Sequence, residues 1–113
     1  MIHVEIQSTE DRKSYGFEIS GHAYSGDPGK DLVCAGASAI AFGTVNAINS
    51  ILQITPGIEQ GEEGGFLSVV IDPSDLDSEI DAKLQIILQT MVTQVYTMVA
   101  SYGEFIELKY KMV

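Results

Sequence analysis

The sequence predicts an α+β fold of two layers, in which two helices pack on one face of a small sheet. Two stretches alternate apolar and polar residues as half-buried strands do, at residues 2–7 and 15–20. Two longer stretches repeat apolar residues every three or four positions, as amphipathic helices do, at residues 32–53 and 76–102. With the remaining short strands, the expected element order is β-β-α-β-β-α-β.

Length and composition favour a single domain over residues 1–113. Hydrophobic residues make up 45% of the chain, and it contains no internal repeat, which suits one buried core. The only cysteine excludes an intrachain disulfide and suits a reducing compartment. The first residues lack the basic and apolar regions of a signal peptide, so a cytoplasmic location is expected.

Charge and hydropathy narrow the classes of partner. The formal net charge of −10 argues against nucleic acid as a partner, because binding of its phosphates requires clustered Lys and Arg. The negative charge favours basic partners, or it serves solubility alone. Two spans lack charged residues, at 32–58 and 84–103. Polar residues interrupt both spans at helical spacing, so no membrane helix is expected.

The first two strands are expected to pair as a hairpin across the polar turn at residues 8–14. His22 follows the second strand directly, and a strand end is a rigid place from which to present an imidazole. The other histidine, His3, lies in the middle of a strand with no neighbouring signal of a site. Residues 24–30 contain Gly and Pro, which break both periodicities and predict a loop whose movement could open a cleft.

The first helix determines what the cysteine can do. Asp31 precedes the helical pattern and is expected to be its N-cap, which places Cys34 in the first turn. Unpaired N–H groups and the dipole at a helix start favour a thiolate, and His22 could take the thiol proton. Ser38 lies one turn further along the same face. Backbone N–H groups near Cys34 are candidates for an oxyanion site.

The second half of the chain begins at Pro56-Gly57, which ends the first helix. Residues 57–60 and 66–71 are expected to form a second hairpin whose later strand is the more buried. The turn between them carries Glu59, Glu62 and Glu63, which predict a solvated tip. No histidine or cysteine joins them, so neither a metal nor a cofactor is expected.

The second helix has two capping signals, Ser74-x-x-Asp77 and Ser78-x-x-Asp81, and Gly103 ends it before a final strand at residues 105–110. Its apolar stripe is broad, which suggests that part of it meets a second subunit. The expected core positions are Leu76, Ile80, Leu84, Ile87, Met91, Val95, Met98 and Tyr102, widened by Leu88, Val92 and Val99. On the first helix they are Val33, Ala37, Ile40, Ala41, Thr44, Ile48, Ile51 and Leu52.

Three motifs together resemble the ribosomal-processing cysteine protease (Prp) family of bacteria. They are Gly21-His22-Ala23, the loop end Gly29-Lys30-Asp31, and Leu32-Val33-Cys34-Ala35 leading to Ser38. The length and the order of predicted elements also agree across the whole chain. Gly36 and Ala37 are smaller than the family pattern leads us to expect.

The resemblance implies a function for each of these residues. Cys34 would be the nucleophile and His22 its partner, Asp31 and Ser38 would line the same site, and Gly21 would give the loop mobility. The implied substrate is the N-terminal extension of a bacterial large-subunit ribosomal protein. The implied assembly is a homodimer.

Other functions remain open from the residues alone. A lone cysteine in a helix is often a small buried hydrophobe, and Asp31 can be a cap and nothing more. The chain could then be a non-catalytic acidic module that binds a basic ribosomal or ribosome-assembly protein. A thiol redox protein is disfavoured because the chain has no resolving cysteine.

Overall fold

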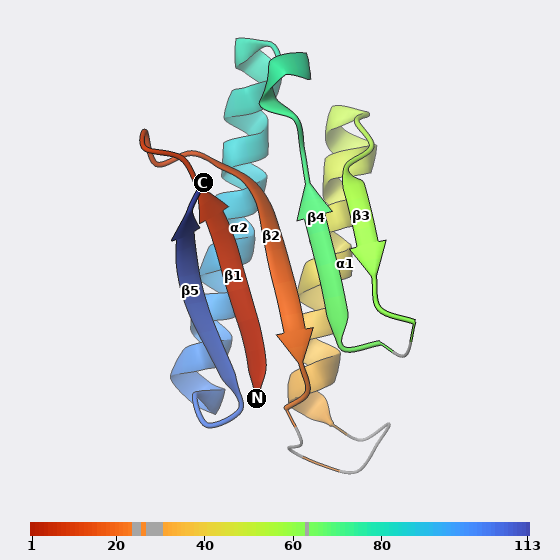
Figure 1. The fold of residues 1–113 in the computed structure, drawn as a ribbon, viewed down its shortest axis with the longest axis vertical. Helices are drawn as coiled ribbons and strands as arrows, with labels where there is room; N and C mark the ends of the chain where they lie inside the picture. The colour runs from red at the N-terminus through yellow and green to blue at the C-terminus, as the bar shows by residue number, and fades with distance from the viewer. Residues whose placement is uncertain (24–25, 27–30, 63) are drawn as a thin grey trace.

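The computed structural model describes residues 1–23, 26, 31–62 and 64–113. Within these residues the chain forms five strands and two long helices in the predicted order, with one short 3₁₀ helix added (Figure 1). The strands are β1 (Ile2–Ser8), β2 (Ser14–Gly21), β3 (Gly57–Gln60), β4 (Phe66–Val70) and β5 (Ile106–Met112). The helices are α1 (Leu32–Leu52), η1 (Pro73–Asp75) and α2 (Ser78–Tyr102).

The strands form one mixed sheet in the order β3-β4-β2-β1-β5. Both predicted hairpins are present, because β1 pairs antiparallel with β2 and β3 with β4. The chain crosses from β4 through α2 to add β5 parallel to β1. Both long helices lie behind the same face of the sheet (Figure 1), which confirms the predicted α+β class.

The core lies between this face of the sheet and the two helices. Ile2, Val4 and Ile6 of β1 are buried, whereas the intervening residues are more exposed, as the alternation predicts. The largest fully buried side chains are Phe17, Ile48, Leu84, Met91 and Ile106. The β4 strand is more buried than β3, all of whose residues are exposed, as expected for an edge strand.

Two predicted core residues lie outside the core. Ile51 is 62% exposed, because it lies at the margin of a stripe that ends through Ile48 and Leu52 in the last turn of α1. Tyr102 is 43% exposed and is the final residue of α2. The helical period identifies a face, but it does not show where along the helix the covering layer ends.

The start of α2 differs from both predicted serine caps. The N-cap is Asp77, whose carboxylate accepts a hydrogen bond from the backbone N–H of Ile80. Asp72 caps the preceding 3₁₀ helix in the same way, through the N–H of Ser74. An ionised carboxylate is a strong acceptor at a helix N-terminus, which favours aspartate as the N-cap residue. The Ser-x-x-Asp patterns had assigned the N-cap to a serine.

The broad stripe of α2 is explained within one chain. Leu88 and Val92, which widen it, are buried because α2 packs against both the sheet and α1. Gly36 of α1 faces Met98 of α2, and a Cβ at Gly36 would lie 3.0 Å from the Met98 methyl carbon. The small residue therefore makes room for the methionine between the helices.

Among the described residues, α1 is the one helix whose length and hydropathy would suffice for a membrane span. In its most apolar window, 33% of the residues are buried inside the structure. A core helix meets the same two criteria, so the absence of a membrane span stays a prediction. The predicted loop at residues 24–30 lies outside the described residues except for Gly26.

Candidate active site

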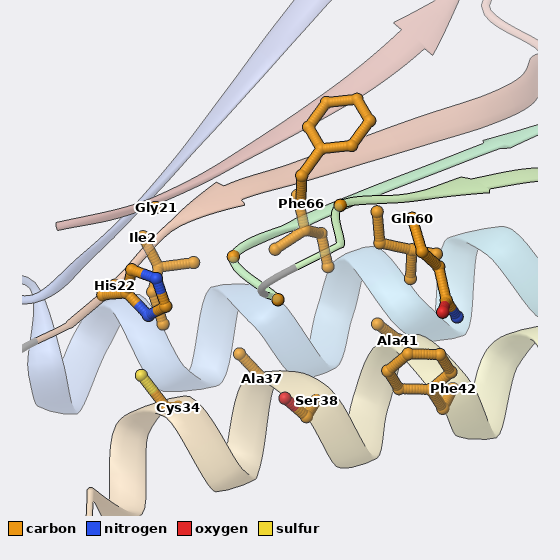
Figure 2. A pocket seen from close by; sticks show the side chains of 15 residues that line it. Ile2, Gly21, His22, Cys34, Ala37, Ser38, Ala41, Phe42, Gln60 and Phe66 are labelled. Carbon is orange, nitrogen blue, oxygen red and sulfur yellow. The ribbon is translucent and has the colours of Figure 1, made fainter. Parts of the chain in front are cut away.

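A cleft of ≈ 340 Å³ opens between α1 and the end of the sheet where β2 stops and the β3–β4 turn begins. Cys34 and Ser38 line it from α1, and His22 lines it from the residue after β2 (Figure 2). Gly21 also lines it, whereas Asp31 lies at the adjoining helix start. The residues that the sequence predicted for the site therefore come from two segments, one after β2 and one at the start of α1, and the fold brings them to one cleft.

Cys34 lies in the first turn of α1 and is partly buried. Asp31 is the N-cap, as predicted, and its carboxylate accepts the Cys34 N–H at 3.0 Å. The Ala35 N–H donates to the Asp31 carbonyl, also at 3.0 Å. The N–H groups of Cys34 and Ala35 are thus bonded to Asp31 in this structure. An oxyanion site formed by backbone N–H groups near Cys34 stays a prediction.

His22 is exposed and is held by the backbone on both sides. Its carbonyl accepts a hydrogen bond from the Met1 nitrogen at 2.6 Å. The preceding residue, Gly21, donates its N–H to the Gly65 carbonyl of the β3–β4 turn at 2.9 Å. The position of His22 is therefore fixed by Met1, which precedes β1, and by the second hairpin as well as by its own strand.

Gly21 itself has a backbone requirement. Its φ is +91°, a conformation that residues with a side chain rarely adopt. A Cβ here would also clash with the Met1 carbonyl oxygen. The structure thus gives Gly21 a role in the close approach of β1 to the strand end, and loop mobility is not needed to explain it.

A direct hydrogen bond joins the two halves of the site. The backbone N–H of buried Ala23 donates to the Cys34 sulfur at 3.4 Å. Figure 2 shows the His22 imidazole and the Cys34 sulfur facing the same space, with the helix below and the strand end above. A thiol and an imidazole in one cleft can act as a nucleophile and a general base.

The cleft extends along α1 beyond Cys34. Ser38 and Phe42 follow at intervals of one helical turn, and Ala37 and Ala41 form its floor. Phe42 was absent from the predicted site, although its spacing from Cys34 and Ser38 was a usable signal. On the opposite side, Gln60 and the turn glycines line the cleft, and nothing near Cys34 in the sequence indicated them.

The second histidine serves a different surface. His3 alternates with buried Ile2 and Val4, so it projects from the face of the sheet away from the helices. Its imidazole pairs with the Glu107 carboxylate on β5. Hydrogen bonds from His3 and Lys109 lower the pKa of Glu107 below its ordinary value.

Metal-binding side chains do not gather anywhere in the described part of the chain. No three His, Cys, Asp or Glu residues there lie close enough to hold an ion. The Glu59 and Glu62 side chains of the acidic turn are exposed, and Glu63 lies outside the described residues. The polar side chains that line the cleft include the Cys34 thiol, the His22 imidazole and the Ser38 hydroxyl.

Comparison with known proteins identifies relatives that share nearly the whole chain. The family model described as cysteine protease Prp matches residues 1–107. The ribosomal processing cysteine protease Prp of Bacillus subtilis is 35% identical over 104 residues, which is 92% of each chain. The protein of the same name from Staphylococcus aureus is 39% identical over 111 residues, covering 98% of this chain and 100% of the relative.

The fold of this chain also agrees with that of a solved relative. A crystal structure of the essential ribosomal processing protease Prp from Staphylococcus aureus, in complex with a covalently linked product peptide, superposes with a TM-score of 0.82. It is 38% identical, and the match covers 98% of this chain and 100% of that one. The resemblance seen in the sequence motifs is confirmed, and the chain belongs to the cysteine protease Prp family.

Proposed function

We propose that this protein is a cysteine endopeptidase in which Cys34 is the nucleophile and His22 the general base. His22 takes the thiol proton as the Cys34 sulfur attacks the scissile carbonyl carbon. The imidazolium returns that proton to the leaving amine as the C–N bond breaks, which leaves a thioester. Water, deprotonated by His22, then adds to the thioester and releases the acid and the thiol.

The observation that carries the proposal is that Cys34 and His22 line one cleft. The Ala23 N–H, next to His22 in the chain, also donates a hydrogen bond to the Cys34 sulfur at 3.4 Å. That bond holds the segment after His22 against the first turn of α1. A nucleophile and a base need this kind of fixed proximity, because orientation supplies much of the rate gain in such reactions. Ser38 and Gly21 border the same cleft, and Asp31 holds the helix start that presents the sulfur.

The proposed substrate is the N-terminal extension of a bacterial large-subunit ribosomal protein. The relatives are named for ribosomal processing, and one was crystallised with a covalently linked product peptide. The net charge of −10 favours encounter with a basic ribosomal protein. The cleft runs along α1 past Ser38 to Phe42, which offers an apolar surface to an extended peptide.

The test is cleavage of a peptide that spans the junction between extension and mature protein, followed by mass spectrometry. Wild-type protein should cut the peptide at one bond, and Cys34→Ala should abolish cutting while its circular dichroism spectrum stays unchanged. His22→Ala should lower kcat by about 100-fold or more. Retained cleavage by a clean Cys34→Ala preparation would overturn the nucleophile assignment.

Alkylation separates this proposal from a non-catalytic acidic binding module. Iodoacetamide should modify an activated Cys34 rapidly near neutral pH, and His22→Ala should slow the reaction. A structural thiol would react slowly in both proteins. Slow alkylation of the wild type, together with uncut peptide that still binds, would favour the binding module.

We further infer that residues 1–113 act as a single cytoplasmic protease domain that assembles as a homodimer. The exposed outer face of α2 beyond Lys83 supports the dimer, because its residues between Ile86 and Thr97 are uncharged in a protein of net charge −10. Its threonine hydroxyls donate back to the helix's own carbonyls and leave methyl groups outward. This face consists of Ile86, Gln89, Thr90, Thr93 and Thr97.

Sedimentation velocity tests this assembly. Thr93→Glu places a charge in the middle of the α2 outer face and should shift the protein from dimer to monomer. Gln53→Glu adds the same charge beyond the end of α1 and should leave the dimer intact. A wild-type protein that sediments as a monomer at micromolar concentration would contradict the dimer.

A further inference from the structure

The His22 imidazole lies directly against a glycine of the second hairpin. A Cβ built on Gly65 would lie 2.6 Å from Nε2 of His22 and 3.2 Å from its Cε1. Real Cβ atoms essentially never approach another heavy atom within 3.0 Å. The imidazole can therefore occupy its observed position only while residue 65 has no side chain.

The contact is fixed by the backbone around it. The Gly65 carbonyl accepts the Gly21 N–H at 2.9 Å, which ties the β3–β4 turn to the strand end that carries His22. Within the turn, Gly61 donates its N–H to the Phe66 carbonyl at 3.1 Å. The hairpin thus holds the α-carbon of Gly65 beside the imidazole as part of the wall of the cleft.

We propose that Gly65 is a positioning residue for His22, whose bare backbone forms the surface on which the imidazole rests while it serves Cys34. This inference rests on the proposed function, because it assigns the position of the base in that reaction. A side chain at residue 65 would push the ring away from its place and leave the sulfur and its helix untouched. A displacement of about 1 Å at a reacting group can lower the rate by about 100-fold.

The neighbouring Gly64 offers a matched control. The two glycines have nearly the same φ, +77° at Gly64 and +76° at Gly65. An alanine at either residue therefore has to adopt a positive φ, which is unfavourable for a residue with a side chain. A Cβ at Gly64 meets nothing within 4 Å, so only the substitution at Gly65 touches the imidazole.

The experiment compares Gly65→Ala with Gly64→Ala. We expect both variants to lower the thermal midpoint by a similar amount, and Gly65→Ala to have a kcat/KM for the junction peptide about 100-fold lower than that of Gly64→Ala. Equal activity of the two variants would overturn the inference. A shift in midpoint that is far larger for Gly65→Ala would also count against it, because the clash would then be with the fold.

Two further measurements separate a displaced base from a blocked cleft. Iodoacetamide is small and does not need the peptide groove, so its reaction with Cys34 should slow in Gly65→Ala and not in Gly64→Ala. Peptide affinity, measured in a Cys34→Ala background, should change much less than turnover. Normal alkylation with lost peptide binding would mean that Gly65 only shapes the groove.

The imidazole itself provides a spectroscopic signal. The chain has two histidines, His3 and His22, so a proton NMR spectrum contains two ring Cε1–H signals, which His22→Ala assigns. Gly65→Ala should move the His22 signal and leave the His3 signal in place, whereas Gly64→Ala should move neither. An inactive wild type would defeat the proposed protease, but the shift of the His22 signal would still test the contact with Gly65.

Discussion

The Ala23 N–H donates to the Cys34 sulfur across 3.4 Å, so the residue next to His22 is bonded to the side chain that His22 is proposed to serve. The bond joins the segment after β2 to the first turn of α1, which are separated in the sequence by residues 24–30. The backbone of Cys34 is held as well, because the Asp31 carboxylate accepts a hydrogen bond from its N–H at 3.0 Å. The sulfur is therefore positioned by the backbone N–H of Ala23, and the helix start is positioned by the side chain of Asp31.

The Asp31 cap leads to a prediction about stability and activity. Asp31→Ala removes the acceptor of the Cys34 N–H and should lower the free energy of unfolding by about 1 kcal/mol. Asp31→Asn keeps a good capping side chain and should retain most of this stability. Urea unfolding of the three proteins measures the difference, with the m-value as a check that the transition is unchanged.

The same pair of variants decides whether Asp31 does more than cap the helix. If its role is the cap, Asp31→Asn keeps kcat/KM near the wild-type value. A stable Asp31→Asn protein with strongly reduced kcat would contradict that expectation, and it would assign the carboxylate charge a part in the proposed dyad.

His3 should be dispensable for peptide cleavage. It projects from the face of the sheet away from the helices and pairs with Glu107, so it cannot act at the cleft. His3→Gln should therefore leave kcat/KM unchanged, in contrast to the loss expected for His22→Ala. A peptidase assay of both variants under one set of conditions makes the comparison. A large loss of kcat/KM in His3→Gln would contradict the assignment of His22 as the catalytic base.

The sequence predicted the parts of the site that depend on local patterns. The helical period and the capping rules located Cys34 and Asp31 at a helix start, and the strand alternation put His22 at a strand end. The strand order could not be read, because pairing across the sheet depends on long-range packing. Gly65 was missed for the same reason: it lies 31 residues beyond Cys34, and only the β2–β4 pairing brings it to His22.

Phe42 should contribute to substrate binding and not to the chemical step. It lines the cleft two turns beyond Cys34 and is 43% exposed, so a bound peptide can cover it. Phe42→Ala should raise KM by about tenfold with kcat nearly unchanged, because the ring contacts substrate equally in the ground and transition states. Ile51→Ala is the control, since Ile51 is exposed on the same helix outside the cleft. A fall in kcat without a change in KM would contradict this role.

A polar cluster around Asp81, in the first turn of α2, leads to a prediction about stability in acid. Asp81 accepts hydrogen bonds from Lys13 at 3.1 Å, from the Tyr15 hydroxyl at 3.0 Å and from Gln85 at 3.1 Å. Burial opposes ionisation of Asp81, but the bonds from Gln85, Lys13 and Tyr15 outweigh it and lower the pKa of Asp81 below its ordinary 3.8. Burial, followed by the bond to Asp81, raises the pKa of Tyr15.

The sign of the pH effect follows from the lowered pKa. Because the folded protein holds the Asp81 carboxylate more readily ionised than the unfolded chain does, the group adds stability above pH 3.8. That contribution is lost as the pH falls through the folded-state pKa. The free energy of unfolding of the wild type should therefore fall more steeply between about pH 5 and pH 3 than that of Asp81→Asn.

Urea unfolding at a series of pH values measures this difference, and other carboxylates cancel because both proteins contain them. Asp75→Asn, which removes one exposed carboxylate in η1, is the control for the change in net charge. Tyr15→Phe removes one hydrogen bond to the carboxylate and should cost about 1.5 kcal/mol near neutral pH. Parallel curves for the wild type and Asp81→Asn would mean that the hydrogen bonds of the cluster do not lower the pKa of Asp81 in the folded protein.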